Sequence, residues 1–349
     1  MMIRTKVNQL SPDGFTRFFF LTDFLKQLYE GTNKKVRILD IGGGSEYFEQ
    51  KLKASGLDYE LTIIDILERP TAVKATYVKG DATNMNFKDD SFDAVVSTDV
   101  MEHIPPERKQ AFLDEALRVA KDVCIIGAPF MTPGVDAAER AVNNFNKKLF
   151  GVGQDWLEEH LELGKPTVGL FEKTLKEKNI PYFHLGTQNL TTWLLNTHIN
   201  LIDAKLGLDD TQHVKINKFY NDNALSMNEF EGMTYRQFFV MFTNPLYEKK
   251  FDATRYATRE KNAESFTKYV SMLMDLFAQR ISYLGASVSG LEKDKAGLEE
   301  KLERTELLVK KMDEQIEFQN LQLKRADPYM RIINSKQLNA VKKLIGRSR

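Results

Sequence analysis

The side chains best suited to ligand chemistry follow a short apolar run near the N-terminus. This run, residues 36–41, is rich in branched side chains, which is typical of a buried parallel strand. It contains Asp40 and is followed by Gly42, Gly43 and Gly44. Glycines after a strand let the chain turn sharply and let a ligand approach the backbone, because no Cβ is in the way. The pattern predicts a nucleotide-type pocket at the carboxyl edge of a sheet.

The residues after the glycines distinguish between nucleotide cofactors. Ser45 is a candidate N-cap for a helix that begins near Glu46 and presents free N–H groups to a ligand. The dinucleotide pattern G-x-G-x-x-G is not met, because its third glycine would fall at Tyr47. We therefore expect an adenine cofactor without a pyrophosphate, rather than NAD or FAD.

Two further candidate strands lead into carboxylates. Residues 61–64 are followed by Asp65, whose carboxylate is suited to accept hydrogen bonds from both hydroxyls of a ribose. Residues 76–78 lead to Asp81 and Ala82, and Asp81 could accept a hydrogen bond from the amino group of an adenine. The carboxyl ends of parallel strands share one edge of a sheet, so these groups are expected near the glycines.

A fourth candidate strand completes a set of motifs that carries a family resemblance. Residues 92–97 are followed by T-D-V-M-E-H-I, which includes Thr98, Asp99 and His103. With I-L-D-I-G-G-G, I-I-D and G-D-A before it, in that order, the chain resembles the class I S-adenosylmethionine-dependent methyltransferases that have E-H-I after the fourth strand. The resemblance covers roughly residues 36–244. It departs from the family where Glu46 occupies the last glycine position of D-x-G-x-G-x-G.

The resemblance implies a fold and a cofactor site. The expected fold is α/β, with a Rossmann-like mixed sheet of seven strands whose last strand is antiparallel to the others. The cofactor would be S-adenosyl-L-methionine. The residues that match the family's cofactor positions are Asp40, Gly42, Gly44, Asp65, Asp81, Ala82, Thr98 and Asp99.

Histidines are the candidate bases for methyl transfer to an oxygen, since imidazole can take a proton near neutral pH. His103 follows the fourth strand, although in the resembled family the Glu-His pair often shapes the cofactor wall. His160 follows Glu158 and Glu159, either of which could orient it. We predict His160 and His103 as catalytic and leave open which of them is the base. No two histidines share a helix face with a carboxylate at ligand spacing, so no metal site is predicted.

The segment around His160 also indicates an acceptor class. Its sequence, W-L-E-E-H-L-E-L-G-K-P, resembles the W-L-x-E-H-x-x-x-G-x-P segment of bacterial methyltransferases encoded with polysaccharide-building enzymes. This resemblance implies methylation of a sugar or glycan intermediate. Two alternatives stay open, which are methylation of a phenol, quinone or lipid, and a scaffold that has lost turnover and presents a coiled coil.

Composition divides the chain into three parts. Residues 1–250 are predicted to form the methyltransferase domain, with helical insertions at 130–165 and 189–232. Residues 254–327 have the pattern of a long helical coiled coil. Residues 328–349 form a basic tail.

The coiled-coil prediction depends on apolar residues at alternating spacings of four and three, with three polar positions in the seam. The predicted seam is Val270, Met274, Phe277, Ile281, Leu284, Val288, Leu291, Lys295, Leu298, Leu302, Thr305, Val309, Met312, Ile316, Gln319 and Leu323. Because an exposed seam is unfavourable on a lone helix, we expect self-association or a coiled-coil partner through residues 263–326. The alternative is a seam that folds back on the catalytic domain.

Charge and cysteine content bound the compartment and the partners. The 49 basic and 49 acidic side chains cancel, so overall charge favours neither nucleic acid nor membrane. Cys124 is the one cysteine, which excludes an intramolecular disulfide and favours a reducing, cytoplasmic location. Residues 329–349 carry basic and apolar residues without an acid, so the tail is either an anionic-membrane contact or a solvated or partner-bound helix. Nucleic acid is not expected as a partner.

Overall fold

Seven strands form one mixed sheet in the computed structural model, which describes residues 10–68, 75–208, 211–227, 232–256 and 263–323. The strand order is β3-β2-β1-β4-β5-β7-β6. The strands are β1 (Val36–Ile41), β2 (Tyr59–Asp65), β3 (Thr76–Lys79), β4 (Phe92–Thr98), β5 (Ala120–Pro129), β6 (Tyr182–Asn189) and β7 (Thr234–Met241). β1 to β5 pair in parallel, and β7 is antiparallel to both of its neighbours, β5 and β6. The predicted fold is confirmed.

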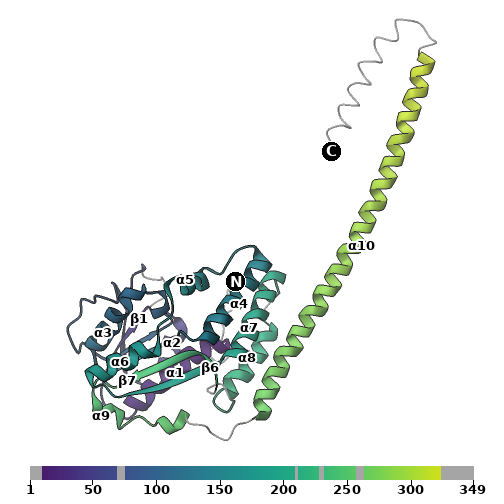
Figure 1. Ribbon diagram of the computed structural model, residues 1–349. Coiled ribbons are helices and arrows are strands. Elements are labelled where there is room, and N and C mark those ends of the chain that lie inside the picture. Colours follow the sequence, from purple (N-terminus) through teal and green to yellow (C-terminus); the bar gives the residue numbers. More distant parts are fainter. Residues whose placement is uncertain (1–9, 69–74, 209–210, 228–231, 257–262, 324–349) are drawn as a thin grey trace. The chain divides into compact units, whose positions relative to one another are not determined.

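Helices cover both faces of this sheet (Figure 1). The helices of the described residues are α1 (Pro12–Tyr29), α2 (Glu46–Ser55), α3 (Lys109–Val119), α4 (Pro133–Phe150), α5 (Asp155–Leu163), α6 (Val168–Lys178), α7 (Leu190–Leu206), α8 (Thr211–Asn223), α9 (Pro245–Glu248) and α10 (Ala263–Leu323), with the short 3₁₀ turns η2 (Met101–His103), η3 (Pro106–Arg108) and η4 (Ala253–Tyr256). One apolar core combines Ile38 of β1 with α1, α2, α8 and the start of α10. The opposite core combines Leu39 of β1 with α3 and α6. Successive strand residues thus enter different cores, which explains the nearly continuous apolar strands.

Capping residues begin α1 and α2, and the cap at Ser45 was predicted from the sequence. The Ser11 hydroxyl accepts a hydrogen bond from the Gly14 N–H at 3.2 Å, and Pro12 begins α1. The Ser45 hydroxyl accepts from the Tyr47 N–H at 3.3 Å, at the start of α2. These caps satisfy N–H groups that a helix start otherwise leaves unpaired.

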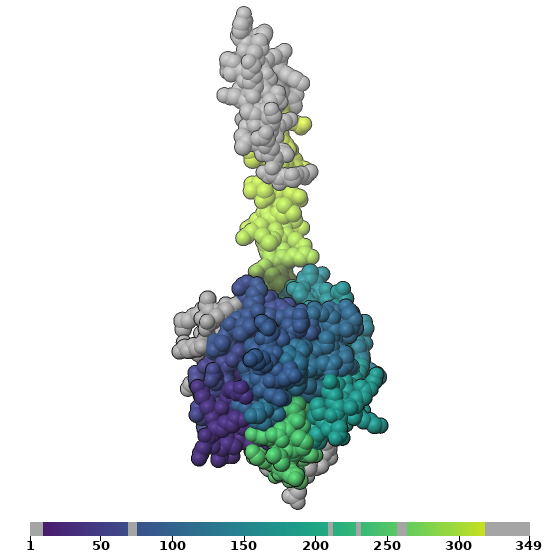
Figure 2. All heavy atoms as spheres, turned by 90° about the vertical axis from the view of Figure 1, so that its left-hand side faces the viewer, coloured from purple at the N-terminus to yellow at the C-terminus, as the bar shows by residue number. Residues whose placement is uncertain are grey.

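The two predicted insertions form helices that pack against each other. The first insertion contains α4 and α5, and the second contains α7 and α8. Val142 of α4, Leu157 of α5 and Trp193 of α7 belong to one small apolar cluster, separate from the cores on the sheet. In the space-filling view, the N-terminal part of the domain, in purple, lies beside the segment near residue 250, in green, on one face of the first unit (Figure 2). The insertions therefore share a small core of their own, while α8 also packs in the core on the sheet.

The first turns of α10 pack on the domain through a face next to the predicted seam. Tyr269, Leu273, Leu276 and Arg280 are buried, and each directly precedes a seam residue. The chain divides into compact units after Arg280, whereas the sequence prediction placed the domain boundary at about residue 250. The difference arises because α10 carries two adjacent apolar stripes at the same spacing, and its first turns bury one of them.

The second unit is described as a helix up to Leu323. Every side chain from Ile281 to Leu308 is exposed, including Leu291 (69 %) and Leu298 (66 %). The coiled coil stays a prediction, and the basic tail lies outside the described residues. Within the part of the chain that the structure describes, no helix is both long and apolar enough to span a membrane.

Candidate active site

The glycine turn after β1 lies directly against the segment after β4. Gly42 has φ +68°, and a Cβ at this position would lie 2.3 Å from Cγ2 of Val100. β1 and β4 are adjacent parallel strands, with Ile41 opposite Ser97. Only glycine satisfies both the left-handed backbone and the close approach. Since Val100 immediately precedes η2, the turn that carries Glu102 and His103 begins beside Gly42.

Asp40 is a buried carboxylate folded over the glycine turn. A Cβ on Gly43 would lie 1.9 Å from its Oδ2, so the carboxylate occupies the space that a side chain there would need. Burial raises the pKa of Asp40 to about 7, the negative charge of Asp65 adds to the effect, and the N–H of Gly44 opposes it. A buried carboxylate in this state fits a cationic ligand group, such as those of S-adenosylmethionine, which would favour its ionised form.

The two other predicted cofactor carboxylates lie at the ends of β2 and β3 and are fixed locally. Asp65 accepts a hydrogen bond from the Leu67 N–H at 2.8 Å. Asp81 accepts from the Thr83 N–H at 2.9 Å and pairs with Arg108 at 2.6 Å. This hydrogen bond to Arg108 lowers the pKa of Asp81. Ribose and adenine contacts through these residues and Ala82 stay predictions.

Asp99 follows Thr98 at the end of β4 and is held by two guanidinium groups. Its φ is +53°, which is uncommon for a residue with a side chain. Its carboxylate lies 2.6 Å from Arg17 and 2.6 Å from Arg236. Arg236 is 1 % exposed and also pairs with Asp13 at 2.9 Å. The side chain of Asp99 is thus part of a buried ionic network, and its predicted role at the cofactor pocket stays untested.

Sequence analysis missed Arg236, although one signal was present. Arg236 is a cation in the buried strand β7, two residues before the apolar run 238–241, and a charge in a buried strand is expected to be paired. Despite the opposing effect of burial, Asp99 and Asp13 raise its pKa well above the ordinary arginine value.

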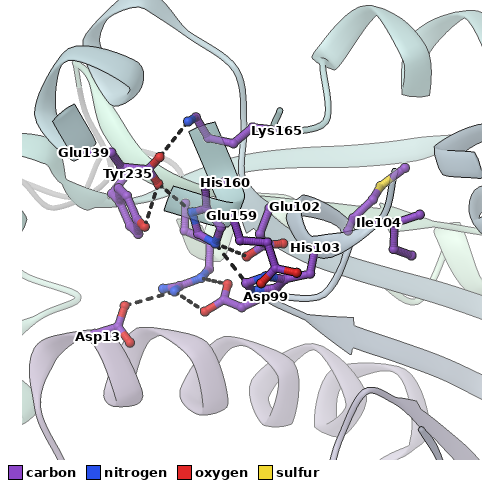
Figure 3. A network of polar contacts seen from close by, with 12 residues as sticks. Asp13, Asp99, Glu102, His103, Ile104, Glu139, Glu159, His160, Lys165 and Tyr235 are labelled. Carbon is purple, nitrogen blue, oxygen red and sulfur yellow. Dashed lines mark hydrogen bonds and ion pairs between the residues drawn. The ribbon is translucent and has the colours of Figure 1, made fainter. Parts of the chain in front are cut away.

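The two predicted catalytic histidines face each other across the site (Figure 3). His103 ends η2 and His160 lies on α5, and their Nε2 atoms are 3.4 Å apart. Their ring centroids are 4.8 Å apart. His160 is buried, whereas the His103 side chain is 32 % exposed and keeps one side of the pair open. The structure therefore brings together two residues that are 57 positions apart in the sequence.

A carboxylate lies behind each imidazole and fixes its orientation. Glu159 contacts Nδ1 of His103 at 2.8 Å, and Glu139 contacts Nδ1 of His160 at 3.0 Å. Glu139 also receives hydrogen bonds from Lys165 at 2.6 Å and from the Tyr235 hydroxyl at 3.0 Å. Although burial acts in the opposite direction, His160 and Lys165 lower the pKa of Glu139. Glu139 is therefore ionised and accepts the Nδ1–H of His160, which leaves Nε2 facing His103.

Glu102 is the third group that points into this space. It is fully buried, and its Oε1 lies 4.0 Å from Nε2 of His160. Neither carboxylate oxygen has a hydrogen-bond partner among the described residues. Burial, and then the charge of Asp99, raise its pKa well above the ordinary glutamate value. Glu102, His103 and His160 each place one candidate ligand atom within 4.8 Å of the others.

This grouping differs from the sequence prediction of no metal site. That prediction considered ligand spacing on a single helix face, whereas these ligands come from η2 and α5, which meet only in the folded chain. The adjacent Glu102 and His103 were visible in the sequence, but nothing in the sequence indicated that His160 lies opposite them.

Lys109 holds the η2 turn through the carbonyl oxygens of its backbone. Its ammonium group donates hydrogen bonds to the carbonyl oxygens of Met101, at 2.8 Å, and of Ile104. Burial lowers its pKa to about 8. Lys109 thus holds the turn that carries Glu102 and His103, a role that was not predicted from the sequence.

The remaining histidines make their contacts outside this pair. His184 stacks on Phe239, and the Nε2 of His213 lies 2.5 Å from Asp203. The Nδ1 of His198 donates to the Leu194 carbonyl at 2.8 Å. Their contacts are those of ordinary packing and pairing.

Comparison with known proteins finds a family that matches one segment of the chain. Residues 39–126 match the family described as "Methyltransferase domain". The chain is 34 % identical over 121 residues to a demethylmenaquinone methyltransferase of Clavibacter sepedonicus, which covers 32 % of this chain and 49 % of that protein. It is 33 % identical over 90 residues to an uncharacterized methyltransferase of Mycolicibacterium vanbaalenii, covering 24 % of this chain and 34 % of that protein. The chain thus spans half or less of the length of these relatives.

Solved methyltransferases are among the structures similar to this chain. A Haemonchus contortus phosphoethanolamine N-methyltransferase 2, in complex with phosphomonomethylethanolamine and S-adenosylhomocysteine, has a TM-score of 0.40 at 15 % identity, covering 67 % of this chain and 54 % of that one. A plantazolicin methyltransferase in complex with S-adenosylhomocysteine has a TM-score of 0.40 at 16 % identity, covering 65 % and 85 %. Residues 39–126 thus match a methyltransferase domain.

Proposed function

We propose that the chain is an S-adenosylmethionine-dependent methyltransferase that methylates an oxygen held at the His103–His160 pair. One observation carries this proposal, which is the contact between Gly42 and Val100. It joins the glycine turn of the cofactor side to the turn that carries His103. Donor and acceptor groups would therefore meet at one edge of the sheet, as ligands do in open α/β folds.

The residues of the pair suit the chemistry of this transfer. The acceptor oxygen attacks the methyl carbon, the carbon–sulfur bond breaks with its electrons on sulfur, and a base takes the acceptor proton. His160 is the proposed base, because its Nδ1–H is directed at Glu139 and its Nε2 faces His103, the partly exposed member of the pair. Glu139 would stabilise the imidazolium that forms. A positioned base contributes a factor of about 10²–10⁴, and alignment of the reactants up to about 7–11 kcal/mol.

A sugar or glycan intermediate is the acceptor class that we favour. The segment that resembles enzymes of polysaccharide biosynthesis supplies His160 and Lys165 to the site. The surrounding side chains are carboxylates, imidazoles and an ammonium group, which suit a hydroxylated acceptor better than an apolar ring. Trp156 is 37 % exposed, and its ring centroid lies 5.3 Å from that of His160, so it offers an aromatic surface beside the pair.

A quinone acceptor is the second candidate, favoured by the similarity to a demethylmenaquinone methyltransferase. That similarity covers 32 % of this chain. Acceptor assays with hydroxylated sugars and with quinols separate the two, since each class requires a different lining around the histidines.

Calorimetric titration of the full chain tests the cofactor first. We expect S-adenosylmethionine to bind, NAD not to bind, and Asp65→Ala to abolish the binding, because the ribose hydroxyls lose their acceptor. Asp58→Ala is the matched control, since Asp58 is a carboxylate that precedes the same strand. Absence of binding in the wild-type chain would contradict the proposal and favour a scaffold without turnover.

We also propose that α10 mediates self-association through its exposed apolar seam. Ile281, Val288, Leu291, Leu298 and Leu302 are each more than half exposed, although such side chains are normally buried. Light scattering of the full chain should give a dimer or higher oligomer. The variant Leu291→Glu/Leu298→Glu should be monomeric, and a monomeric wild-type chain would exclude the proposal.

A further inference from the structure

We propose that Glu102, His103 and His160 bind one divalent transition-metal ion at the acceptor side of the site. The binding of the ion does not depend on the proposed function. The role of the ion in activating the acceptor does depend on it. Three side chains supply the candidate ligand atoms, which are a carboxylate oxygen and two Nε2 nitrogens within 4.8 Å of one another.

The hydrogen bonds of the two imidazoles leave both lone pairs pointing at the same space. A carboxylate accepts and does not donate, so Glu139 and Glu159 each fix the proton of their histidine on Nδ1. In the neutral imidazoles the two Nε2 atoms then both carry lone pairs, and they lie only 3.4 Å apart. Two acceptors at this distance repel each other unless a proton or a metal cation lies between them.

Glu102 adds a third acceptor to the same space. Its carboxylate is fully buried, and among the described residues no donor reaches either oxygen. An unpaired buried carboxylate is costly. The buried ammonium group of Lys165 is already paired with Glu139 at 2.6 Å and Asp136 at 3.6 Å. A bound cation would therefore satisfy Glu102 together with both histidines.

The spacing of the nitrogens suits a tetrahedral ion. Two nitrogens about 2.0–2.1 Å from one tetrahedral Zn²⁺ lie about 3.4 Å apart, and the Nε2 atoms of His103 and His160 are 3.4 Å apart. Glu102 Oε1 is 4.0 Å from Nε2 of His160, so the carboxylate has to move closer to complete the set. Imidazole ligands favour zinc, cobalt and similar ions over Mg²⁺, which prefers oxygen.

The surroundings are those of a supported metal site. Metal-binding histidines usually donate their other N–H to a carboxylate, which fixes the ring and raises its basicity. Here both histidines do so, and Lys165 and Tyr235 in turn hold Glu139 in place. The partly exposed His103 leaves an open side for a fourth ligand.

That fourth ligand would be the acceptor hydroxyl. A hydroxyl bound to a divalent cation loses its proton more readily, and the proton would leave to solvent along the exposed side of His103. In the metal-loaded protein the ion then replaces His160 as the group that activates the acceptor, since one Nε2 cannot bind the ion and take a proton.

Metal titration of the chelator-treated full chain tests the proposal. We expect Co²⁺ to give visible absorption bands of a four-coordinate site and calorimetry with Zn²⁺ to give one ion per chain. His160→Ala and Glu102→Gln should lose this saturable binding, and Glu139→Gln should weaken it about 10–100-fold. His198→Ala is the matched control, because His198 lies outside the site, and it should bind as the wild type does.

Two further measurements keep the result interpretable. His103→Gln replaces a partly exposed ligand, so it should lose the ion without unfolding, as circular dichroism would verify. S-adenosylmethionine binding is measured on each protein. Cofactor binding without metal binding would overturn the metal site and leave the proposed function standing. Metal binding without cofactor binding would overturn the proposed function and leave the metal site standing. Equal metal affinity in His160→Ala and the wild type would also overturn the proposal.

Discussion

The cofactor side and the acceptor side of the sheet edge are held together differently. On the cofactor side, Asp65 and Asp81 accept hydrogen bonds from N–H groups two residues further along the chain. On the acceptor side, Glu139 is bound by Tyr235, which is 96 positions away. Arg236 of the adjoining network pairs with Asp13, 223 positions away.

This difference shows what each side requires of the sequence. A carboxylate fixed by its own turn needs only a short motif, and it forms wherever the strand ends. A carboxylate fixed by distant side chains, such as Glu139, is held only when the insertions, α1 and β7 pack in their native arrangement. We therefore expect substitutions on the acceptor side to affect folding and chemistry together, and substitutions on the cofactor side to act mainly on ligand binding.

Arg236→Met should produce the largest effect on stability. The substitution leaves Asp13 and Asp99 without their shared buried guanidinium, and breaking such a pair costs about 3–5 kcal/mol. We expect the free energy of unfolding, measured in urea, to fall by about 3 kcal/mol, the lower end of that range, because Arg17 still pairs with both carboxylates. Arg255→Met is the control, since Arg255 is 43 % exposed and its buried partner Asp23 keeps the hydrogen bond from the Tyr256 hydroxyl. That ion pair should contribute under about 1 kcal/mol. Equal losses for the two variants would contradict the distinction.

Gly42→Ala should disturb the contact that joins the two sides. The left-handed backbone of Gly42 would cost about 1–2 kcal/mol with a side chain, and the clash with Val100 about 1–3 kcal/mol more. Adding Val100→Ala should relieve the clash and restore the stability lost to it, but the cost of the left-handed backbone should remain. Unfolding free energies of the single and double variants measure this coupling. Strict additivity would show that the two residues do not meet.

Glu139→Gln should reduce turnover without weakening cofactor binding. The amide no longer holds the Nδ1–H of His160 with a charge, so kcat should fall about 10–100-fold. The affinity for S-adenosylmethionine should stay unchanged. Glu158→Gln is the matched control, because Glu158 lies on the same helix as His160 but is exposed and pairs with Lys147. A similar loss in both variants would exclude a specific role for Glu139.

The pH dependence of cofactor binding should report on Asp40. Its pKa is raised to about 7 by burial, so the carboxylate is ionised only above that pH, and the cationic cofactor should bind more tightly as the pH rises. Below pH 7 the affinity should fall by about tenfold per pH unit, and above it the affinity should level off. Asp40→Asn should bind more weakly with a flat profile. A wild-type profile that is already flat between pH 5 and about 7 would contradict this role.

Much of the fold was predictable from the sequence because its signals are local. The apolar strands, the caps at Ser11 and Ser45 and the acidic strand ends are each written within a few residues. The prediction of seven strands with an antiparallel last member also drew on the family resemblance, and it is confirmed. The packing of the first turns of α10 on the domain could not be predicted, since two adjacent apolar stripes of the helix share one spacing and only packing selects between them.

The sequence by itself determined which chemical groups stand at the ends of the strands, including Asp40, Asp65 and Asp81, because side-chain periodicity and turn chemistry act over a few residues. The tertiary structure decided which groups face one another. It placed His160 against His103 and Glu102, set Arg236 between Asp13 and Asp99, and buried Leu273 of α10 rather than Met274. These pairings depend on the closure of long loops around shared cores, so no local pattern specifies them.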